Sequence, residues 1–347
     1  MQYFTLKVVG RFYETSDTVT VSFKQPGLKK IKYSAGQYLT LIFRINGRRY
    51  MRPYSFSSAP FIDADLEVTI KRVPGGIVSN HIIDSLKVGD IVEVMEPMGD
   101  FILRENNIAQ DTRIVLWGAG SGITPLMSLA KYALHQNIAS HVTLIYGNRN
   151  IESVIFNDKI EDLKKRFDNK FSVWHFHTRL AIRSNNPYVI EGRISPQKVL
   201  SVMQDENNFD NSLHYICGPV GLKESVKAVL LNHGVSNEKI YFEDFEVARN
   251  PADFDEIVTR EVLIKKGGQH TTVEVAKGKS ILEAGLDAMI ELSYSCQTGN
   301  CLVCKGRLIK GEVKMIGVKK LPEDLQQNEY LLCSSFPLTD EVEIEVD

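Results

Sequence analysis

Four of the five cysteines of this 347-residue chain stand near its C-terminus, at a spacing that could hold an iron–sulfur cluster. The pattern C-x4-C-x2-C is formed by Cys296, Cys301 and Cys304, and 28 residues separate Cys304 from Cys333. This spacing is typical of the plant-type 2Fe–2S cluster. Gly299 keeps the loop small, so that backbone N–H groups can reach the sulfurs and adjust the reduction potential. A structural zinc site is the alternative, although such sites usually take two C-x2-C pairs.

A glycine-rich run from Trp117 to Pro125 follows an apolar strand pattern and opens a helix pattern. It places Gly118, Gly120 and Gly122 in the form G-x-G-x-G-x-x-P. Since the N–H groups at a helix N-terminus bind anions, this context predicts a cradle for the pyrophosphate of a dinucleotide. The loop alone is weak evidence, because its spacing differs from the usual G-x-G-x-x-G.

Arg52, Pro53, Tyr54 and Ser55 open the run R-P-Y-S-F-S-S, whose side chains suit a flavin nucleotide. A guanidinium can hold a phosphate, a tyrosine ring can stack on the isoalloxazine, and a hydroxyl can approach the flavin nitrogen that accepts hydride. The run resembles R-x-Y-S-x-x-S, the flavin-binding signature of the ferredoxin–NADP reductase family. The resemblance implies those three roles for Arg52, Tyr54 and Ser55. By itself the run could be an edge strand with exposed polar residues.

The segment 71–81 resembles the second flavin segment of that family, in which a glycine turn leads into a helix whose N–H groups receive the pyrophosphate. The resemblance implies that Lys71, Gly76, Val78 and Ser79 contact the flavin nucleotide. It also favours FAD, because FMN-containing reductases of the same domain order differ in this segment.

Four more residues follow from the same resemblance. Thr124 is expected near the nicotinamide, and Cys217-Gly218 matches the family's second nicotinamide signature at a strand end. Phe245 matches the aromatic residue that lies near the flavin in the family. The alternatives are a small buried hydrophobe for Cys217 and a core aromatic for Phe245.

Arginines after two predicted strands bear on the choice of nicotinamide. An acidic residue after the second strand would bind the ribose of NAD, whereas an arginine there accommodates the extra phosphate of NADP. Arg149 occupies this place, and Thr178-Arg179 resembles the Ser/Thr-Arg pair that holds the same phosphate in the family. NADPH is therefore favoured, with NADH possible. Solvated surface arginines are the alternative.

Three scaffolds are needed to position these residues. Short alternating segments in residues 1–108 predict an antiparallel β-barrel for the flavin. Residues 109–246 alternate apolar strand, glycine turn and helix, which predicts an α/β doubly wound parallel sheet for the nicotinamide. The polar, proline-containing residues 247–258 are expected to form a linker. Residues 259–347 resemble the ferredoxin domain appended to oxygenase reductases, which implies a β-grasp α+β fold.

Composition narrows the class of protein. A net charge of -2 argues against a general nucleic-acid binder, which normally carries a basic excess. No apolar run approaches the ~18 residues that span a bilayer, so no integral membrane segment is expected. The N-terminus lacks the charged-then-apolar order of a signal peptide, and a cytoplasmic location is expected.

Over nearly its whole length the chain resembles oxygenase reductases of the ferredoxin–NADP reductase family, a group that includes the reductase of phenylacetyl-coenzyme A epoxidase. This implies hydride transfer from NADPH to FAD, then single-electron transfer through the 2Fe–2S cluster to a partner oxygenase or desaturase. Tyr54, Ser55 and Cys217 are expected nearest the reacting atoms.

Other functions stay open. They are the reductase of a Rieske oxygenase or of a fatty-acyl desaturase, and a redox carrier or sensor without turnover. The flavin subunit of a membrane ion pump fits less well, because such subunits have the reversed domain order.

Overall fold

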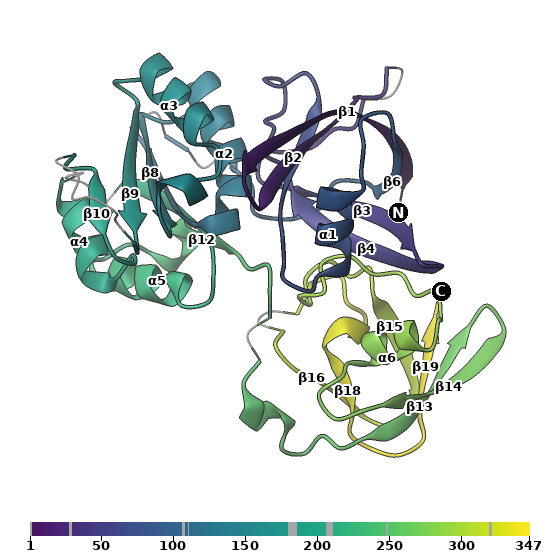
Figure 1. Cartoon of the computed structure of the whole chain (residues 1–347). Helices are drawn as coiled ribbons and strands as arrows, with labels where there is room; N and C mark the ends of the chain where they lie inside the picture. Colours follow the sequence, from purple (N-terminus) through teal and green to yellow (C-terminus); the bar gives the residue numbers. More distant parts are fainter. Residues whose placement is uncertain are drawn as a thin grey trace. The chain divides into compact units, whose positions relative to one another are not determined.

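The computed structural model describes residues 2–27, 30–105, 108–109, 111–179, 186–205, 211–247, 249–318 and 321–347. Its chain forms two compact units, coloured along the sequence in Figure 1. The first unit contains Met1–Leu41 and Tyr54–Asp244, and the second contains Ile42–Pro53 and Phe245–Asp347. The two units therefore do not coincide with the three predicted domains, whose boundaries stay predictions. One residue of the predicted linker, Ala248, lies outside the described residues.

The N-terminal sheet has six strands in the order β4-β3-β6-β1-β2-β5. The long strand β1 contains bulges, pairs with β6 through its first half and with β2 through its second half, and both ladders are antiparallel. A bridge between Phe56, just after β4, and Val68 in β5 links the two edges of the sheet and closes it. This confirms the antiparallel architecture. The strands are β1 Tyr3–Thr15, β2 Thr18–Phe23, β3 Tyr38–Ile45, β4 Arg48–Ser55, β5 Leu66–Lys71 and β6 Ile91–Met95, and helix α1 is Ile77–Asp84.

The second sheet is parallel in every ladder, as predicted, with the order β10-β9-β8-β7-β11-β12. The strand order reverses beside β7, and ligands of such sheets bind at the carboxyl ends of the strands at this point. Cys217 at the end of β11 pairs there with Gly118 near the end of β7. The strands are β7 Arg113–Ala119, β8 His141–Asn148, β9 Phe171–His177, β10 Val189–Glu191, β11 Ser212–Cys217 and β12 Ile240–Glu243.

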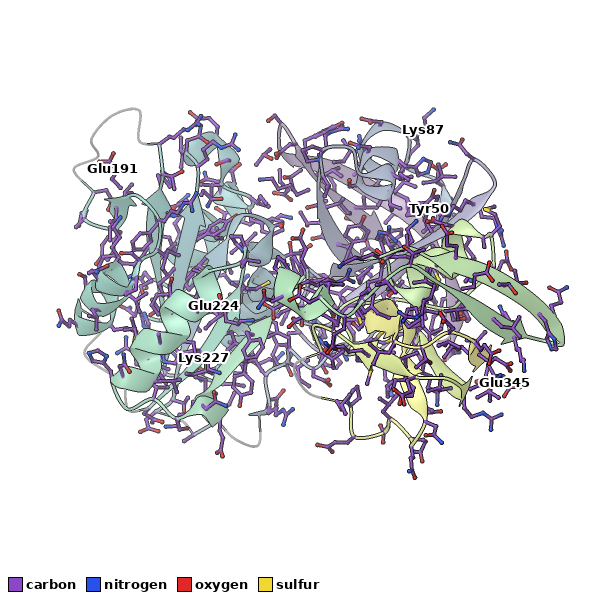
Figure 2. All side chains as sticks on the ribbon, turned by 90° about the horizontal axis from the view of Figure 1, so that it is seen from below. Tyr50, Lys87, Glu191, Glu224, Lys227 and Glu345 are labelled. Atoms are coloured by element: carbon purple, nitrogen blue, oxygen red, sulfur yellow. The ribbon has the colours of Figure 1, made fainter. Side chains whose placement is uncertain are left out.

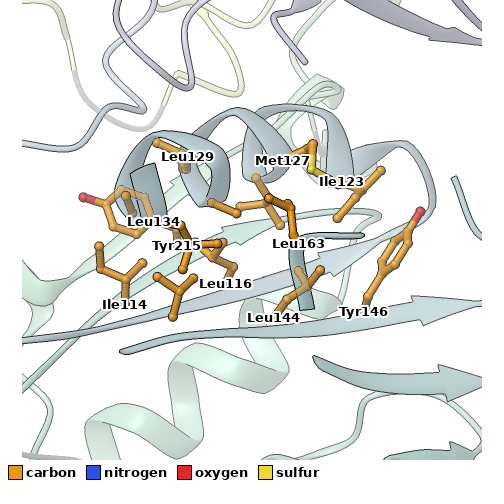
Figure 3. Packing of buried hydrophobic residues seen from close by; sticks show 14 of the residues in the cluster. Ile114, Leu116, Ile123, Met127, Leu129, Leu134, Leu144, Tyr146, Leu163 and Tyr215 are labelled. Atoms are coloured by element: carbon orange, nitrogen blue, oxygen red, sulfur yellow. The ribbon is translucent and has the colours of Figure 1, made fainter. Parts of the chain in front are cut away.

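Helices cover both faces of this sheet because its side chains alternate between two apolar clusters. Helices α2 (Ile123–His135) and α3 (Asn157–Arg166) pack on one face, where Figure 3 shows Leu116 and Tyr215 beneath α2. On the other face, α4 (Pro196–Asp205) and α5 (Leu222–Asn232) pack against a cluster that includes Val115, Trp117 and Trp174.

The outward face of α5 is polar. Glu224 and Lys227 lie on this helix in Figure 2, while its Val226 and Leu230 are buried in the core. This division is the expected pattern of an amphipathic surface helix. In the part of the chain that the structure describes, no helix combines the length and the apolar character needed to cross a membrane.

The C-terminal sheet is mixed, with the order β14-β13-β19-β15-β17. Strand β19 runs parallel to β13 and antiparallel to β15. Helix α6 follows Ser280, and its capping box joins Ser280 to Glu283. The elements are β13 Arg260–Lys266, β14 Gln269–Val275, α6 Ile281–Asp287, β15 Lys305–Lys310, β16 Val313–Met315, β17 Glu329–Leu331, β18 Ser335–Pro337 and β19 Val342–Val346.

Helix α3 begins directly after Phe156, because Phe156 adopts a left-handed backbone with φ 64° and serves as the N-cap. The predicted linker contains a short 3-10 helix, Pro251–Phe254, because Asn250 caps it and a proline suits its first turn.

Replacing Leu116 with alanine should destabilise the parallel sheet by about 2–5 kcal/mol, because the side chain is fully buried under α2 and its loss leaves a cavity. Both tryptophans of the chain, Trp117 and Trp174, lie in this sheet, so tryptophan fluorescence during urea unfolding reports on it. Leu231→Ala is the control, since Leu231 is 42% exposed on α5. Equal midpoints for the two variants would contradict the assigned core.

Candidate functional site

The cysteine loop lies between α6 and β15, and Cys333 lies in a short 3-10 helix, Leu332–Ser334. The backbone N–H of Cys296 donates to Cys301 Sγ at 3.4 Å, and the N–H of Thr298 donates to Cys296 Sγ at 3.4 Å. A hydrogen bond from the Cys301 thiol lowers the pKa of Cys296 to about 5. In the same way, a hydrogen bond from the Cys304 thiol lowers the pKa of Cys333. The four thiols therefore form two pairs.

This pairing suits two irons better than one zinc. Each iron of a 2Fe–2S cluster takes two cysteine thiolates, whereas a structural zinc gathers four ligands around one point. Among the described residues, no group of three His, Cys, Asp or Glu side chains converges on a position that could hold a single ion. The four cysteines would hold a 2Fe–2S cluster, and the division of the thiols between the two irons stays a prediction.

The backbone of the cysteine loop is strained in the way that functional loops often are. Gln297 and Leu302 have φ values of 57° and 62°, which side chains disfavour. Gly299 has a φ of 78°, and a Cβ there would lie 2.9 Å from Val318 Cγ2. The predicted need for a small residue at Gly299 therefore has two physical causes.

Strand β4 carries the predicted flavin residues. Arg52, Pro53 and Tyr54 are half-buried, and Ser55 is buried. The Arg52 guanidinium donates to the carbonyl oxygen of its neighbour Met51 at 2.8 Å. Since the side chains of Arg52 and Tyr54 share one face of the strand, one nucleotide could contact both.

The predicted second flavin segment forms a turn followed by α1. Gly76 is the N-cap of α1, and no acidic side chain occupies the first turn, so its N–H groups suit an anion. Val78 and Ser79 are buried, and the Ser79 hydroxyl accepts a hydrogen bond from the Val73 N–H at 3.2 Å. The Ser79 hydroxyl therefore fixes the turn.

A cavity of about 760 Å³ opens at the carboxyl ends of the parallel strands. Gly120, Arg149 and Thr178 line it, as do Lys71 and Asp17 from the N-terminal sheet. Its size is within the usual range for cofactor sites, ~300–1,000 Å³. The cavity thus brings together three residues predicted for the nicotinamide dinucleotide and Lys71, which was predicted for the flavin.

Other predicted nicotinamide residues lie outside the cavity lining. The Thr124 hydroxyl is buried and donates to the Ser121 carbonyl oxygen at 2.8 Å. Arg179 is exposed, and its backbone N–H donates to the carbonyl oxygen of Arg149. Gly118 belongs to β7. Their direct contact with a coenzyme stays a prediction.

Gly122 fixes the glycine loop against β11. A Cβ on Gly122 would lie 2.1 Å from the carbonyl oxygen of Cys217 and 2.8 Å from the nitrogen of Gly218, so only glycine fits. The hydroxyl of Tyr146, which the sequence analysis did not select, donates to the Gly120 carbonyl oxygen at 2.9 Å and holds the loop from β8.

Cys217 and Phe245 had alternative interpretations as core residues. The Cys217 side chain is 1% exposed within the apolar cluster under α2, and burial raises the pKa of its thiol, which is therefore neutral. Its surroundings are those of a small hydrophobe, and its role beside the nicotinamide stays a prediction. Phe245 is 47% exposed, so it is not a core aromatic.

The sequence analysis missed Arg193, which lines the cavity together with Arg149. Arg193 follows β10, a strand of three residues that is too short to leave a periodic signal. It also missed Tyr294, two residues before Cys296 and buried in the second compact unit. The Tyr294 hydroxyl accepts a hydrogen bond from the Met51 N–H at 3.0 Å.

Comparison with known proteins agrees with this arrangement. The chain matches the oxidoreductase FAD-binding domain over residues 5–102, the oxidoreductase NAD-binding domain over 116–228 and the 2Fe-2S iron-sulfur cluster binding domain over 264–338. Its fold is similar to that of phthalate dioxygenase reductase, with a TM-score of 0.68 and 24% identity over 99% of this chain and 98% of that one.

Two relatives match along nearly their whole length. The chain is 29% identical to one of the subunits of 1,2-phenylacetyl-CoA epoxidase from Escherichia coli K12, over 96% of this chain and 95% of that protein. It is 30% identical to the ferredoxin reductase component of 3-ketosteroid-9-alpha-monooxygenase of Mycobacterium tuberculosis CDC 1551, over 92% and 87%. The chain therefore belongs to the ferredoxin–NADP reductase family, as an NAD(P)H-dependent FAD reductase with a C-terminal 2Fe–2S ferredoxin domain.

Proposed function

We propose that this protein is the NADPH-dependent reductase component of an oxygenase of the phenylacetyl-coenzyme A epoxidase type. Its three matched domains and its relatives support transfer of electrons from NAD(P)H through FAD and a 2Fe–2S cluster to an oxygenase. The observation that carries the proposal is the C-x4-C-x2-C loop with its backbone N–H groups bonded to sulfur, in a chain that also holds a cavity of about 760 Å³. The match along 95% of the epoxidase component supports the choice of acceptor.

The residues of the chain bind and orient the reactants. In the proposed arrangement, Arg52 holds a flavin phosphate, Tyr54 stacks on the ring and Ser55 approaches its reactive nitrogen. The α1 N-terminus and the Gly120 loop each receive a pyrophosphate. The flavin, when bound, divides the electron pair of a hydride into single electrons, which is what a 2Fe–2S cluster requires. The chain thus supplies placement rather than acid or base catalysis.

The choice of NADPH rests on the charges in the cavity. Arg149 and Arg193 both line it, and a guanidinium binds a phosphate through two hydrogen bonds. Glu152 also lines the cavity and would repel a phosphate placed beside it. Lys71 and Asp17 also line the cavity and form an ion pair with each other, with Nζ and Oδ2 3.7 Å apart. The remaining two cations against one carboxylate favour the coenzyme with the extra phosphate.

A second candidate differs in the acceptor. The 30% identity with the 3-ketosteroid monooxygenase reductase is as high as the identity with the epoxidase component, so another oxygenase could receive the electrons. Reconstitution with each purified oxygenase, measured as product formed per NADPH consumed, separates the two. A cytoplasmic location stays a prediction.

An anaerobic titration with NADPH, with NADH alongside, tests the electron path. Visible absorbance follows the flavin, and electron paramagnetic resonance follows the cluster. We expect the flavin to bleach and a reduced 2Fe–2S signal to grow at lower concentrations of NADPH than of NADH. Flavin bleaching without any cluster signal would show that the four cysteines do not hold a cluster.

Replacing Cys333 with serine should abolish the reduced-cluster signal, because one iron loses a thiolate. Bleaching of the flavin by NADPH should persist, since hydride transfer does not need the cluster. Cys217→Ser is the matched control when dithionite is the reductant, because Cys217 is buried in the parallel sheet and the cluster signal then does not depend on the nicotinamide site. Loss of the signal in both variants would indicate unfolding instead.

Replacing Arg149 with alanine should raise the KM for NADPH about 10- to 100-fold, because a hydrogen bond to a charged group contributes about 1.5–3 kcal/mol. The KM for NADH should change little, since NADH lacks the phosphate. Arg166→Ala, an exposed arginine on α3, serves as the control. An equal rise for both coenzymes would place Arg149 away from that phosphate.

A further inference from the structure

Arg249, a residue of the segment between the parallel sheet and the C-terminal sheet, reaches the fourth cysteine of the cluster set. Its Nη2 donates a hydrogen bond to the carbonyl oxygen of Cys333 at 3.3 Å. Its guanidinium also lies over the ring of the buried Phe336, 5.4 Å from the ring centroid. Two contacts thus hold one cation beside the peptide of a cluster ligand.

The backbone around Arg249 packs on the same compact unit. Gly317 leaves room for the neighbouring Val247, because a Cβ on Gly317 would lie 2.3 Å from Val247 Cγ1. Asn250 then caps the short helix that follows. The segment is therefore docked on the C-terminal domain at this point, although its polar composition predicted a free linker.

Arg249 lies in a hollow that also contains carboxylates. Among the described residues, no carboxylate lies within ion-pair distance of it, and two carboxylates line the hollow of about 270 Å³ that it shares with Cys333. These are Glu246 and Glu283, and Glu283 is already bonded to the N–H and hydroxyl of Ser280. Arg249 therefore places its positive charge directly against the Cys333 peptide, in a hollow that the two glutamates share.

We propose that Arg249 sets the reduction potential of the cluster, and that reduction of the cluster in turn tightens the docking of this segment. The proposal rests on the proposed function, since it requires a 2Fe–2S cluster on the four cysteines. Reduction adds one electron from the flavin and no proton, so the cluster gains one negative charge. A nearby cation stabilises that charge, and net charge and hydrogen bonding are known determinants of cluster potential.

The second half of the proposal follows from thermodynamic linkage. If a docked Arg249 favours the reduced cluster by a given factor, the reduced cluster must favour docking by the same factor. The segment that joins the hydride-accepting domains to the ferredoxin domain would then hold more tightly after the electron arrives. Arg249 is a positioning residue in this scheme, because it touches the Cys333 peptide rather than the substrate.

Redox titration of the full-length holoprotein, followed by electron paramagnetic resonance, tests the first half. In Arg249→Gln the reduced-to-oxidised ratio of the cluster at a fixed potential should fall about three- to tenfold, tenfold being about 59 mV for one electron. Arg249→Lys should recover most of the shift because it keeps the charge. Lys310→Gln should match the wild type, since Lys310 is exposed and paired with Glu341.

A wild-type midpoint in Arg249→Gln, with the cluster present, would overturn the proposal. Absence of a cluster from the wild type would instead overturn the proposed function. The two failures are therefore distinct.

Limited trypsin digestion of the wild type tests the second half and needs no variant. Cleavage after Arg249, measured by mass spectrometry, should be several-fold slower in the reduced protein than in the oxidised one. Cleavage after Lys32, an exposed loop residue, is the internal control and should not change. Equal rates after Arg249 in both states would refute redox-linked docking, even if Arg249→Gln failed to take up its cluster.

Discussion

The close backbone approach between Gly122 and Cys217 is the constraint on which the coenzyme end of the molecule depends. A Cβ at position 122 would stand 2.1 Å from the Cys217 carbonyl oxygen, so the loop after β7 lies directly against the end of β11. This contact occurs where the strand order of the parallel sheet reverses, the position at which such sheets bind nucleotides. The Tyr146 hydroxyl holds the same loop from β8. The loop beside the cavity is thus held against the ends of both strands.

The cysteine loop is subject to a different constraint, which is an unfavourable backbone conformation. Gln297, Gly299 and Leu302 all have positive φ values, and two of them carry side chains that disfavour this conformation. The folded domain offsets this cost, since α6 and the surrounding strands fix both ends of the loop. In this conformation the backbone N–H groups point at sulfur, as the hydrogen bonds to the Sγ atoms of Cys296 and Cys301 show.

Charged side chains act at both the coenzyme cavity and the cysteine loop. The cavity gathers Arg149 and Arg193 for a negatively charged coenzyme, while Arg249 presents a cation to the peptide of a cluster cysteine. Each charge acts on a group that becomes or remains negative during electron transfer. A segment that looks like a spacer in the sequence therefore contributes to the redox chemistry.

The cluster-binding loop, the glycine loop and the alternation of strands and helices could be predicted from the local sequence, because each of these depends on neighbours in the chain. The sequence also identified the family and predicted the site residues. Tertiary structure alone decided that Arg193 joins Arg149, that the Tyr294 hydroxyl meets the Met51 N–H, and that Arg249 docks on Cys333. These contacts join residues far apart in the sequence or follow elements too short to show a period. Their physical basis is packing and charge between segments, which no local pattern encodes.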